Sequence, residues 1–332
     1  MSKVLIATFY KFVAIEKFGV MQKRIKSFAL DNRIKGTILV GAEGINSTIA
    51  GPEEDVRNLL AFLRAMPEFS DLSHKESWAD KMPFIRLKVR LKKEIVTLGQ
   101  GPIDPNKIVG TYVDWDKWNE LISDPEVVLV DTRNDYEMQL GTFKGAIDPE
   151  IETFRDFPRW VNENLDPKKH KRVATFCTGG IRGEKATAWM LEQGFEEVYH
   201  LKDGILKYLE NIPEEENLWD GDCFVFDGRV GVGHGLKPGG YTQCPSCRWP
   251  VSEEDKKLPS YEESVSCYNC HDNLTEEHKE RSRMRWKQIQ LAAKRGRQHL
   301  GADLETLKEE KRRLKEELML IDEQEQQTRK AS

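Results

Sequence analysis

Hydrophobic and polar positions over the first hundred residues alternate between strand and helix periodicities. Strand-like runs rich in β-branched and aromatic residues occupy residues 4–12, 37–41, 44–50 and 84–92. Helical spacing occupies residues 17–30 and runs from Pro52 to about Met66, where Pro67 ends it. The resulting order, βαββαβ, predicts a ferredoxin-like α+β domain over residues 1–98.

Cations and aliphatic residues alternate in the last of these strands. The cations are Arg86, Lys88, Arg90 and Lys92, and the aliphatic residues are Ile85, Leu87, Val89 and Leu91. A period of two places the two kinds on opposite faces. The cationic face is either a surface for a phosphate backbone or an ordinary solvated sheet face.

A second pattern begins after a stretch of turn formers, which predicts a linker over residues 99–111. Short apolar strands are expected at 127–130, 172–176 and 197–199, and helices at 158–164 and 182–193. Strands that alternate with helices predict a central parallel α/β domain over residues 112–222.

The composition narrows the class of protein. A chain of 332 residues is too long for one compact core, and 39% hydrophobic with 32% charged residues is typical of a soluble multidomain protein. No apolar run approaches the ~20 residues that span a bilayer, so we expect no membrane association. The first residues lack the basic region of a signal peptide, which favours a cytoplasmic location.

Cys177 is the leading candidate for chemistry. It lies between an expected strand and an expected helix, at the strand end where open α/β sheets bind ligands. Gly179 and Gly180 permit positive φ, so nearby amides can surround an anionic sulfur, and Arg182 adds a permanent positive charge. We expect a thiolate, persulfide or sulfenate, with an inert core cysteine as the alternative. The predicted cradle consists of Thr178, Gly179, Gly180, Ile181 and Gly183.

Several segments together carry a family resemblance. They are Phe176-Cys177-Thr178-Gly179-Gly180-Ile181-Arg182, Leu129-Val130-Asp131-Thr132-Arg133, Tyr136-Glu137, Gly141-Thr142-Phe143-Lys144-Gly145-Ala146, Leu201-Lys202-Asp203-Gly204-Ile205 and Gly41-Ala42-Glu43-Gly44-Ile45-Asn46. Over roughly residues 1 to 300 the chain resembles the rhodanese-domain tRNA uridine hydroxylases. A rhodanese-like central domain is therefore expected.

The resemblance implies an oxidoreductase that forms 5-hydroxyuridine at the wobble position of tRNA. Cys177 and Arg182 would be the catalytic residues, and molecular oxygen would be a co-substrate. Asp131 and Arg133 are implied as supports of the loop, with a purely structural salt bridge as the alternative. Members of the family usually have a second cysteine where this chain has Gly183.

Two other functions are compatible with the same loop. A rhodanese-type sulfurtransferase would carry a persulfide on Cys177, and the cradle suits that anion equally well. A non-catalytic RNA-binding protein is the third hypothesis.

Four of the remaining cysteines form two C-x2-C pairs separated by the 19 residues 248–266. They are Cys244, Cys247, Cys267 and Cys270. Four thiolates at this spacing can close a tetrahedron around zinc without an open position, which predicts a structural zinc in a zinc-ribbon-like module over residues 223–275. A pair of redox dithiols is the alternative. Cys223 is expected to be a buried structural residue.

The last segment, residues 276–332, predicts a basic helical tail. Between positions 279 and 297 the sequence contains eight Lys or Arg and one acidic residue, Glu280. This density favours contact with RNA, and a solvated helix face is the alternative. The resemblance implies that this RNA is tRNA, bound in its anticodon region. The candidate RNA-binding residues here are Arg281, Arg283, Arg285, Trp286 and Lys287. Leu300, Leu304, Leu307, Leu314, Leu318 and Ile321 follow a seven-residue rhythm, which predicts either a short self-associating coiled coil or a frayed solvated helix.

Overall fold

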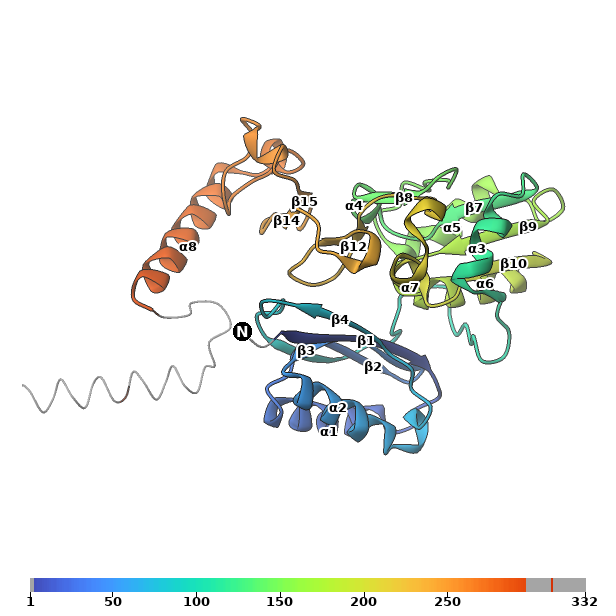
Figure 1. The fold of residues 1–332 in the computed structure, drawn as a ribbon, viewed down its shortest axis with the longest axis horizontal. Coiled ribbons are helices and arrows are strands. Elements are labelled where there is room, and N and C mark those ends of the chain that lie inside the picture. Colours follow the sequence, from blue (N-terminus) through green and yellow to red (C-terminus); the bar gives the residue numbers. More distant parts are fainter. Residues whose placement is uncertain (1–2, 297–311, 313–332) are drawn as a thin grey trace, which may run out of the picture. The chain divides into compact units, whose positions relative to one another are not determined.

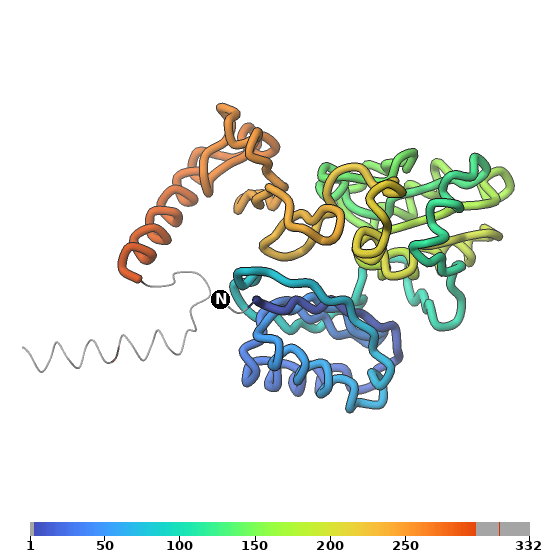
Figure 2. Tube along the Cα trace, in the orientation of Figure 1, coloured from blue at the N-terminus to red at the C-terminus, as the bar shows by residue number. Residues whose placement is uncertain are grey.

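The computed structural model describes residues 3–296 and residue 312, and the predicted coiled coil lies outside these residues. The chain forms two compact units, residues 1–272 and residues 273–332, and each is described by itself. Figure 2 traces the chain from blue at the amino terminus to red.

The amino-terminal domain is a five-stranded sheet with two helices (Figure 1). Its elements are β1 (Val4–Phe12), α1 (Phe18–Asp31), β2 (Lys35–Gly41), β3 (Gly44–Gly51), α2 (Glu53–Arg64), β4 (Lys75–Ala79) and β5 (Leu87–Leu91). The strand order is β4-β1-β3-β2-β5, and the expected ferredoxin-like arrangement is confirmed.

One strand assignment within that arrangement is wrong. The fourth strand of the βαββαβ unit is β4, which pairs antiparallel with β1, whereas the expected strand 84–92 forms β5, a fifth strand parallel to β2 at the opposite edge. The sequence of β4, Lys-Glu-Ser-Trp-Ala, has no apolar alternation because no residue of this edge strand is fully buried.

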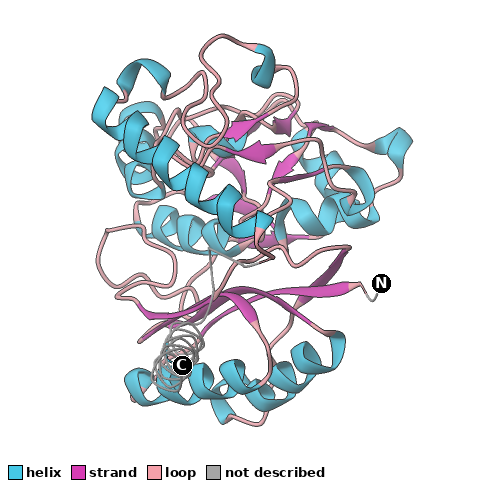
Figure 3. Ribbon diagram, turned by 90° about the vertical axis from the view of Figure 1, so that its left-hand side faces the viewer, coloured by secondary structure: helices cyan, strands magenta, loops and turns pink. Residues whose placement is uncertain are grey.

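The two faces of this sheet differ in what covers them. Helices α1 and α2 pack on one face, and the apolar stripe of α2 is buried there as its periodicity predicts (Figure 3). The stripe consists of Val56, Leu59, Leu60 and Leu63. Residues of the other face, such as Thr8 and Asn46, line a cleft with the central domain.

The central domain is a four-stranded parallel sheet with helices on both faces, which confirms the expected α/β class. Its strands, in the order β6-β10-β9-β7, are β6 (Thr111–Val113), β10 (Glu197–Leu201), β9 (Arg172–Phe176) and β7 (Val127–Asp131). Its helices are α3 (Trp115–Ile122), α4 (Asp135–Met138), α5 (Phe157–Asn164), α6 (Ile181–Glu192) and α7 (Gly204–Asn211). One core joins α5 and α6 to the sheet and another joins α3 and α7 to it.

Short strand pairs follow the central domain. They are β11 (Trp219–Gly221) with β8 (Gly141–Phe143), β12 (Cys223–Phe224) with β13 (Gly231–Val232), and β14 (Thr242–Gln243) with β15 (Pro250–Val251). Single 3-10 turns occur at Pro67–Phe69, Phe154–Asp156, Glu214–Glu216, His234–Leu236, Asp255–Lys257 and His271–Asn273.

The second unit contains α8 (Glu276–Lys294), which confirms the helix expected after residue 275. The side chain of Thr275 caps it by accepting a hydrogen bond from the His278 amide at 3.2 Å. Within residues 3–296, every helix is too short or too polar to cross a membrane.

Candidate active site

Cys177 begins the segment that connects β9 to α6 and includes the first three residues of α6, which we call the thiol loop (residues 177–183). Gly180 precedes the first turn of α6 with φ of 99°, and its amide donates a hydrogen bond to Cys177 Sγ at 3.1 Å. A Cβ at Gly180 would lie 2.8 Å from Tyr10 Oη. Glycine is therefore required at this position for both its conformation and its size. A ring of amides around the sulfur was predicted, and in the described part of the chain the amide of Gly180 is the one that donates to it.

The start of α7 fixes the thiol loop through main-chain hydrogen bonds. The amides of Ile205 and Leu206 donate to the carbonyl oxygens of Cys177 and Thr178 at 3.0 and 3.1 Å. Gly204 has φ of 71°, and a Cβ there would lie 2.5 Å from Cys177 O. The sequence analysis did not predict this helix, which begins at Gly204.

Arg182 points its guanidinium at Glu137. Its Nη1 and Nη2 donate to the two carboxylate oxygens at 2.7 and 2.6 Å, and both side chains are buried. Burial alone would raise the pKa of Glu137, but the charge and hydrogen bonds of Arg182 lower it below its usual value. Thr178 Oγ1 also donates to this carboxylate at 3.2 Å. The guanidinium of Arg182 is thus paired with the Glu137 carboxylate.

Glu137 is a site residue that the sequence analysis did not select, although it lies in a quoted segment. The Asn134 amide donates to its carboxylate at 3.2 Å, at the start of α4. An Asn three residues before a Glu is the local signal that could have placed this carboxylate at a helix start.

Asp131 and Arg133 form a fully buried salt bridge, with Arg133 Nη2 2.6 Å from Asp131 Oδ2. Arg133 Nη1 donates to the carbonyl oxygen of Glu137 at 3.2 Å, and its guanidinium lies 4.9 Å from the Trp219 ring centre. The pair therefore contacts the thiol loop indirectly, through Glu137 and Arg182. Its role as a support stays a prediction.

The amino-terminal domain contacts the thiol loop and the first turns of α6 through polar side chains. Tyr10 Oη donates to Glu184 Oε1 at 2.7 Å. Lys75 Nζ donates to the carbonyl oxygen of Gly179 at 3.1 Å and lies 2.9 Å from Asp203 Oδ1. These contacts were not predicted because they join segments that are far apart in the chain.

Burial shifts the pKa values of two side chains in this contact region. It raises the pKa of Glu184 and, together with the charge of Glu184, raises the pKa of Tyr10. Both groups therefore favour their protonated forms more than exposed groups would.

A pocket of about 680 Å³ opens between the thiol loop and the uncovered face of the amino-terminal sheet. Cys177 lines it although only 1% of the residue is exposed, so its sulfur lies at the inner wall. Aromatic side chains contribute much of the apolar wall. They are Tyr10, Phe84, Tyr136, Phe154 and Phe226.

The cations and the aliphatic residues around β5 were expected on opposite faces. Arg86, Arg90 and Lys92 are exposed as expected, and Lys88 is half-buried. Val89 is buried and Leu87 packs beside it, but Ile85 and Leu91 are about half exposed, at 52% and 49%. The aliphatic positions differ in burial because β5 is a short strand at the edge of the sheet, paired with β2.

Arg248 is a further cation near Lys88. Burial lowers the pKa of Lys88, and the charges of Arg86, Arg90 and Arg248 add to the effect. Arg248 comes from the segment that follows the first cysteine pair, so the positive surface extends beyond the strand.

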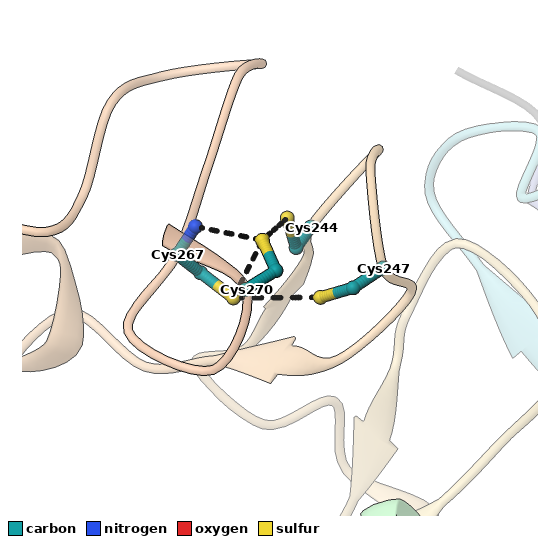
Figure 4. Close-up of side chains that lie close together, drawn as sticks. All are labelled: Cys244, Cys247, Cys267 and Cys270. Carbon is teal, nitrogen blue, oxygen red and sulfur yellow. Dashed lines mark hydrogen bonds between the residues drawn. The ribbon is translucent and has the colours of Figure 1, made fainter. Parts of the chain in front are cut away.

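The two cysteine pairs meet as the sequence predicts (Figure 4). The four sulfurs lie within 4.8 Å of one another, with Cys247–Cys267 at 3.5 Å and both Cys244–Cys270 and Cys267–Cys270 at 3.9 Å. Sulfurs bound to one zinc at ~2.3 Å would be roughly 3.8 Å apart. The cluster could therefore hold a metal ion such as zinc.

The basic residues of α8 are distributed around the helix. Arg281 and Arg285 lie one turn apart on the helix, and so do Arg283 and Lys287. The second pair is two residues further along the chain than the first, so it points in a different direction around the helix axis. Arg283 lies 3.5 Å from Glu280, and Trp286 is partly buried. The helix therefore presents cations in more than one direction.

Cys223 is fully buried in the central domain, and burial raises its pKa to about 12. Its sulfur lies 3.6 Å from the carbonyl oxygen of Phe224. This environment is that of a structural cysteine.

The parallel sheet and the cysteine loop at the end of β9 define a rhodanese-like domain, and the family model of that domain matches residues 114–211. The model of the UPF0176 acylphosphatase-like domain matches residues 4–95. A protein of Sinorhizobium medicae named tRNA uridine(34) hydroxylase is 58% identical over 298 residues, which cover 90% of this chain and 95% of the relative. A relative of the same name from Rhizobium leguminosarum is 56% identical, over 91% of this chain and 97% of its own.

The chain belongs to the family of these tRNA uridine(34) hydroxylases. Among solved structures it is similar to the BLUF protein BlrB, at 18% identity over 30% of this chain and 80% of that chain, with a TM-score of 0.26. A similarity this low carries no argument about fold or function.

Proposed function

We propose that this chain hydroxylates uridine 34 of tRNA to 5-hydroxyuridine, with Cys177 as its reactive group. The match to relatives named for this activity, at 58% identity over 90% of the chain, is the observation that carries the proposal. With tRNA as substrate, we expect the enzyme to act in the cytoplasm.

The geometry around Cys177 supports a chemical role for its sulfur. The Gly180 amide donates to Sγ at 3.1 Å, and Arg182 lies on the same pocket wall. The main-chain donor at the sulfur and the place of Cys177 in the pocket wall are the two features that support this role. Because Cys177 lines the pocket, we expect a nucleotide bound there to lie beside this residue.

The proposal is tested by mass spectrometry of tRNA from cells that lack this protein. We expect the loss of a nucleoside one oxygen heavier than uridine, and its return when the intact gene is supplied. Cys177→Ala should fail to restore it, whereas Cys223→Ala, which removes the other cysteine of this region, should restore it. Loss of a thiolated nucleoside instead would favour a sulfurtransferase.

Molecular oxygen is the proposed source of the added atom. Cells or purified enzyme supplied with ¹⁸O₂ should produce hydroxyuridine that is two mass units heavier. Label that enters from H₂¹⁸O instead would exclude oxygen as the source.

For tRNA contact we propose the cations within and directly beside β5, together with four cations and one tryptophan of α8. Their residues are Arg86, Lys88, Arg90, Lys92, Arg281, Arg283, Arg285, Trp286 and Lys287. Removing one cation that binds a phosphate should reduce the slope of log affinity against log salt by about 0.7 to 0.9. Replacing Arg86 and Arg90 by Gln should therefore weaken tRNA binding and flatten its salt dependence, whereas replacing the distant Arg159 should do neither.

A further inference from the structure

The pocket beside Cys177 has the size of a site for one small ligand. Its volume of about 680 Å³ lies within the range of roughly 300 to 1,000 Å³ that such pockets have. A paired helix does not fit a space of this volume, whereas a single nucleotide turned out of its strand does. The aromatic side chains of the wall offer surfaces on which a base can stack.

Three arginines line this pocket, and they differ in their partners. Arg182 donates hydrogen bonds from Nη2 and Nη1 to the Glu137 carboxylate at 2.6 and 2.7 Å. Arg229 is committed to Asp227 at 2.6 and 2.9 Å and to Ser77 Oγ at 2.9 Å. Arg155 is exposed and forms no ion pair with any residue in the described part of the chain. Arg155 is therefore the arginine of the pocket that is available to an anion.

The amide of Asn46 has a fixed orientation in the same pocket. Its Nδ2 donates to the carbonyl oxygen of Ile95 at 3.0 Å, and because a carbonyl can only accept, the amide cannot turn over without losing this bond. Its Oδ1 accepts no hydrogen bond from the residues that the structure describes. Ile95 in turn packs against Ile181 of the thiol loop, so Asn46 lies close to the reactive end of the pocket.

We propose that the pocket holds one unpaired pyrimidine nucleotide of RNA, with its phosphate at Arg155 and the N3–H of a uracil base at Asn46 Oδ1. The proposal rests on the RNA substrate proposed above. A uracil offers a donor at N3, which matches this oxygen, whereas cytosine has a lone pair at N3. A site built to accept this hydrogen bond disfavours a base that lacks it.

The test is protection of Cys177 from alkylation in the full-length protein. Iodoacetamide labelling of the Cys177 peptide is followed by mass spectrometry in the presence of UMP, uridine or CMP. UMP should protect at lower concentration than uridine, because only UMP carries a phosphate, and at lower concentration than CMP.

Two variants separate the parts of the proposal. Arg155→Ala should weaken protection by UMP about tenfold, as the loss of a charge-assisted hydrogen bond does, and leave protection by uridine unchanged. Arg159→Ala is the matched control, since its exposed side chain lies outside the pocket lining and should change neither. Asn46→Ala should remove the preference for UMP over CMP.

Equal protection by UMP and uridine in the wild-type protein, or an unchanged UMP effect in Arg155→Ala, would overturn the phosphate subsite. Equal protection by UMP and CMP would overturn the role of Asn46. This labelling requires no turnover, so it succeeds or fails independently of the tRNA analysis that tests hydroxylation.

Discussion

Lys185 and Glu43 form an ion pair that joins the central domain to the amino-terminal domain, with Lys185 Nζ 2.8 Å from Glu43 Oε2. Lys185 has a fully buried side chain and also donates to Glu94 Oε2 at 2.8 Å and to the Val96 carbonyl oxygen at 3.0 Å. Lys185 lies two residues beyond the thiol loop, and Glu43 lies in the turn between β2 and β3. The cluster therefore fixes the two walls of the pocket relative to each other.

Lys185→Met should destabilise the protein. Removing one partner of a buried pair costs about 3 to 5 kcal/mol, and because Glu43 and Glu94 keep about a fifth of their side chains exposed, we expect about 2 to 3 kcal/mol in urea unfolding. Lys202→Met is the control, since Lys202 is 47% exposed beside Asp114 and its pair should contribute less than about 1 kcal/mol. Equal effects of the two variants would contradict a linking role for Lys185.

Glu137→Gln should lower stability in a manner that depends on pH. The pKa of Glu137 lies below its usual value in the folded protein, so its ion pair stabilises the fold above the unfolded pKa of about 4.3. That contribution disappears as pH falls through the folded pKa. The difference between wild type and Glu137→Gln should thus be large at pH 7 and shrink below about pH 4. A difference that is constant over this range would show that the charge of Glu137 does not matter.

His200 gives a second pH dependence, which comes from a basic group. Burial lowers its pKa to about 4, against about 6.5 in an unfolded chain. Between these values the unfolded state binds more protons, so stability is lost as pH falls through this window, by about 2 kcal/mol at pH 5. His200→Phe should remove this part of the loss. The free energy of unfolding of both proteins, measured at pH 7.5 and pH 5, tests this prediction. An equal loss of stability between the two pH values in wild type and variant would contradict it.

The sequence predicted those parts of the fold that depend on local patterns. β9 ends at Phe176 as its apolar run predicts, and one of the two glycines after Cys177, Gly180, donates its amide to the sulfur. The polar edge strand β4 was missed because it lacks alternation. Lys185 was missed for another reason: its partners Glu43 and Glu94 are 142 and 91 residues away, and no periodicity connects positions so far apart.

Gly183→Cys tests whether a second thiol at this position can act with Cys177. A Cβ at Gly183 would lie 3.1 Å from His200 Cβ, on the side of α6 that faces β10, and Gly183 does not line the pocket. The new thiol should therefore form no disulfide with Cys177 under mild oxidation. Hydroxylation should change less than about threefold, while stability falls by about 1 kcal/mol because the added atoms crowd His200. A disulfide between Cys177 and the introduced thiol, found by peptide mass spectrometry, would contradict this orientation.

The four-cysteine cluster should bind one structural zinc ion, whose removal unfolds the surrounding segment. The regular structure of this segment consists of the two-residue strands β14 and β15 and a 3-10 turn at Asp255–Lys257, so metal ligation would replace a core that it cannot build. Cys267→Ser should lose nearly all bound zinc in elemental analysis and expose residues 240–270 to protease. Cys223→Ala should keep the full zinc content, because Cys223 lies outside the cluster. Wild-type protein that contains no zinc and forms two disulfides reversibly would instead favour a redox role for these thiols.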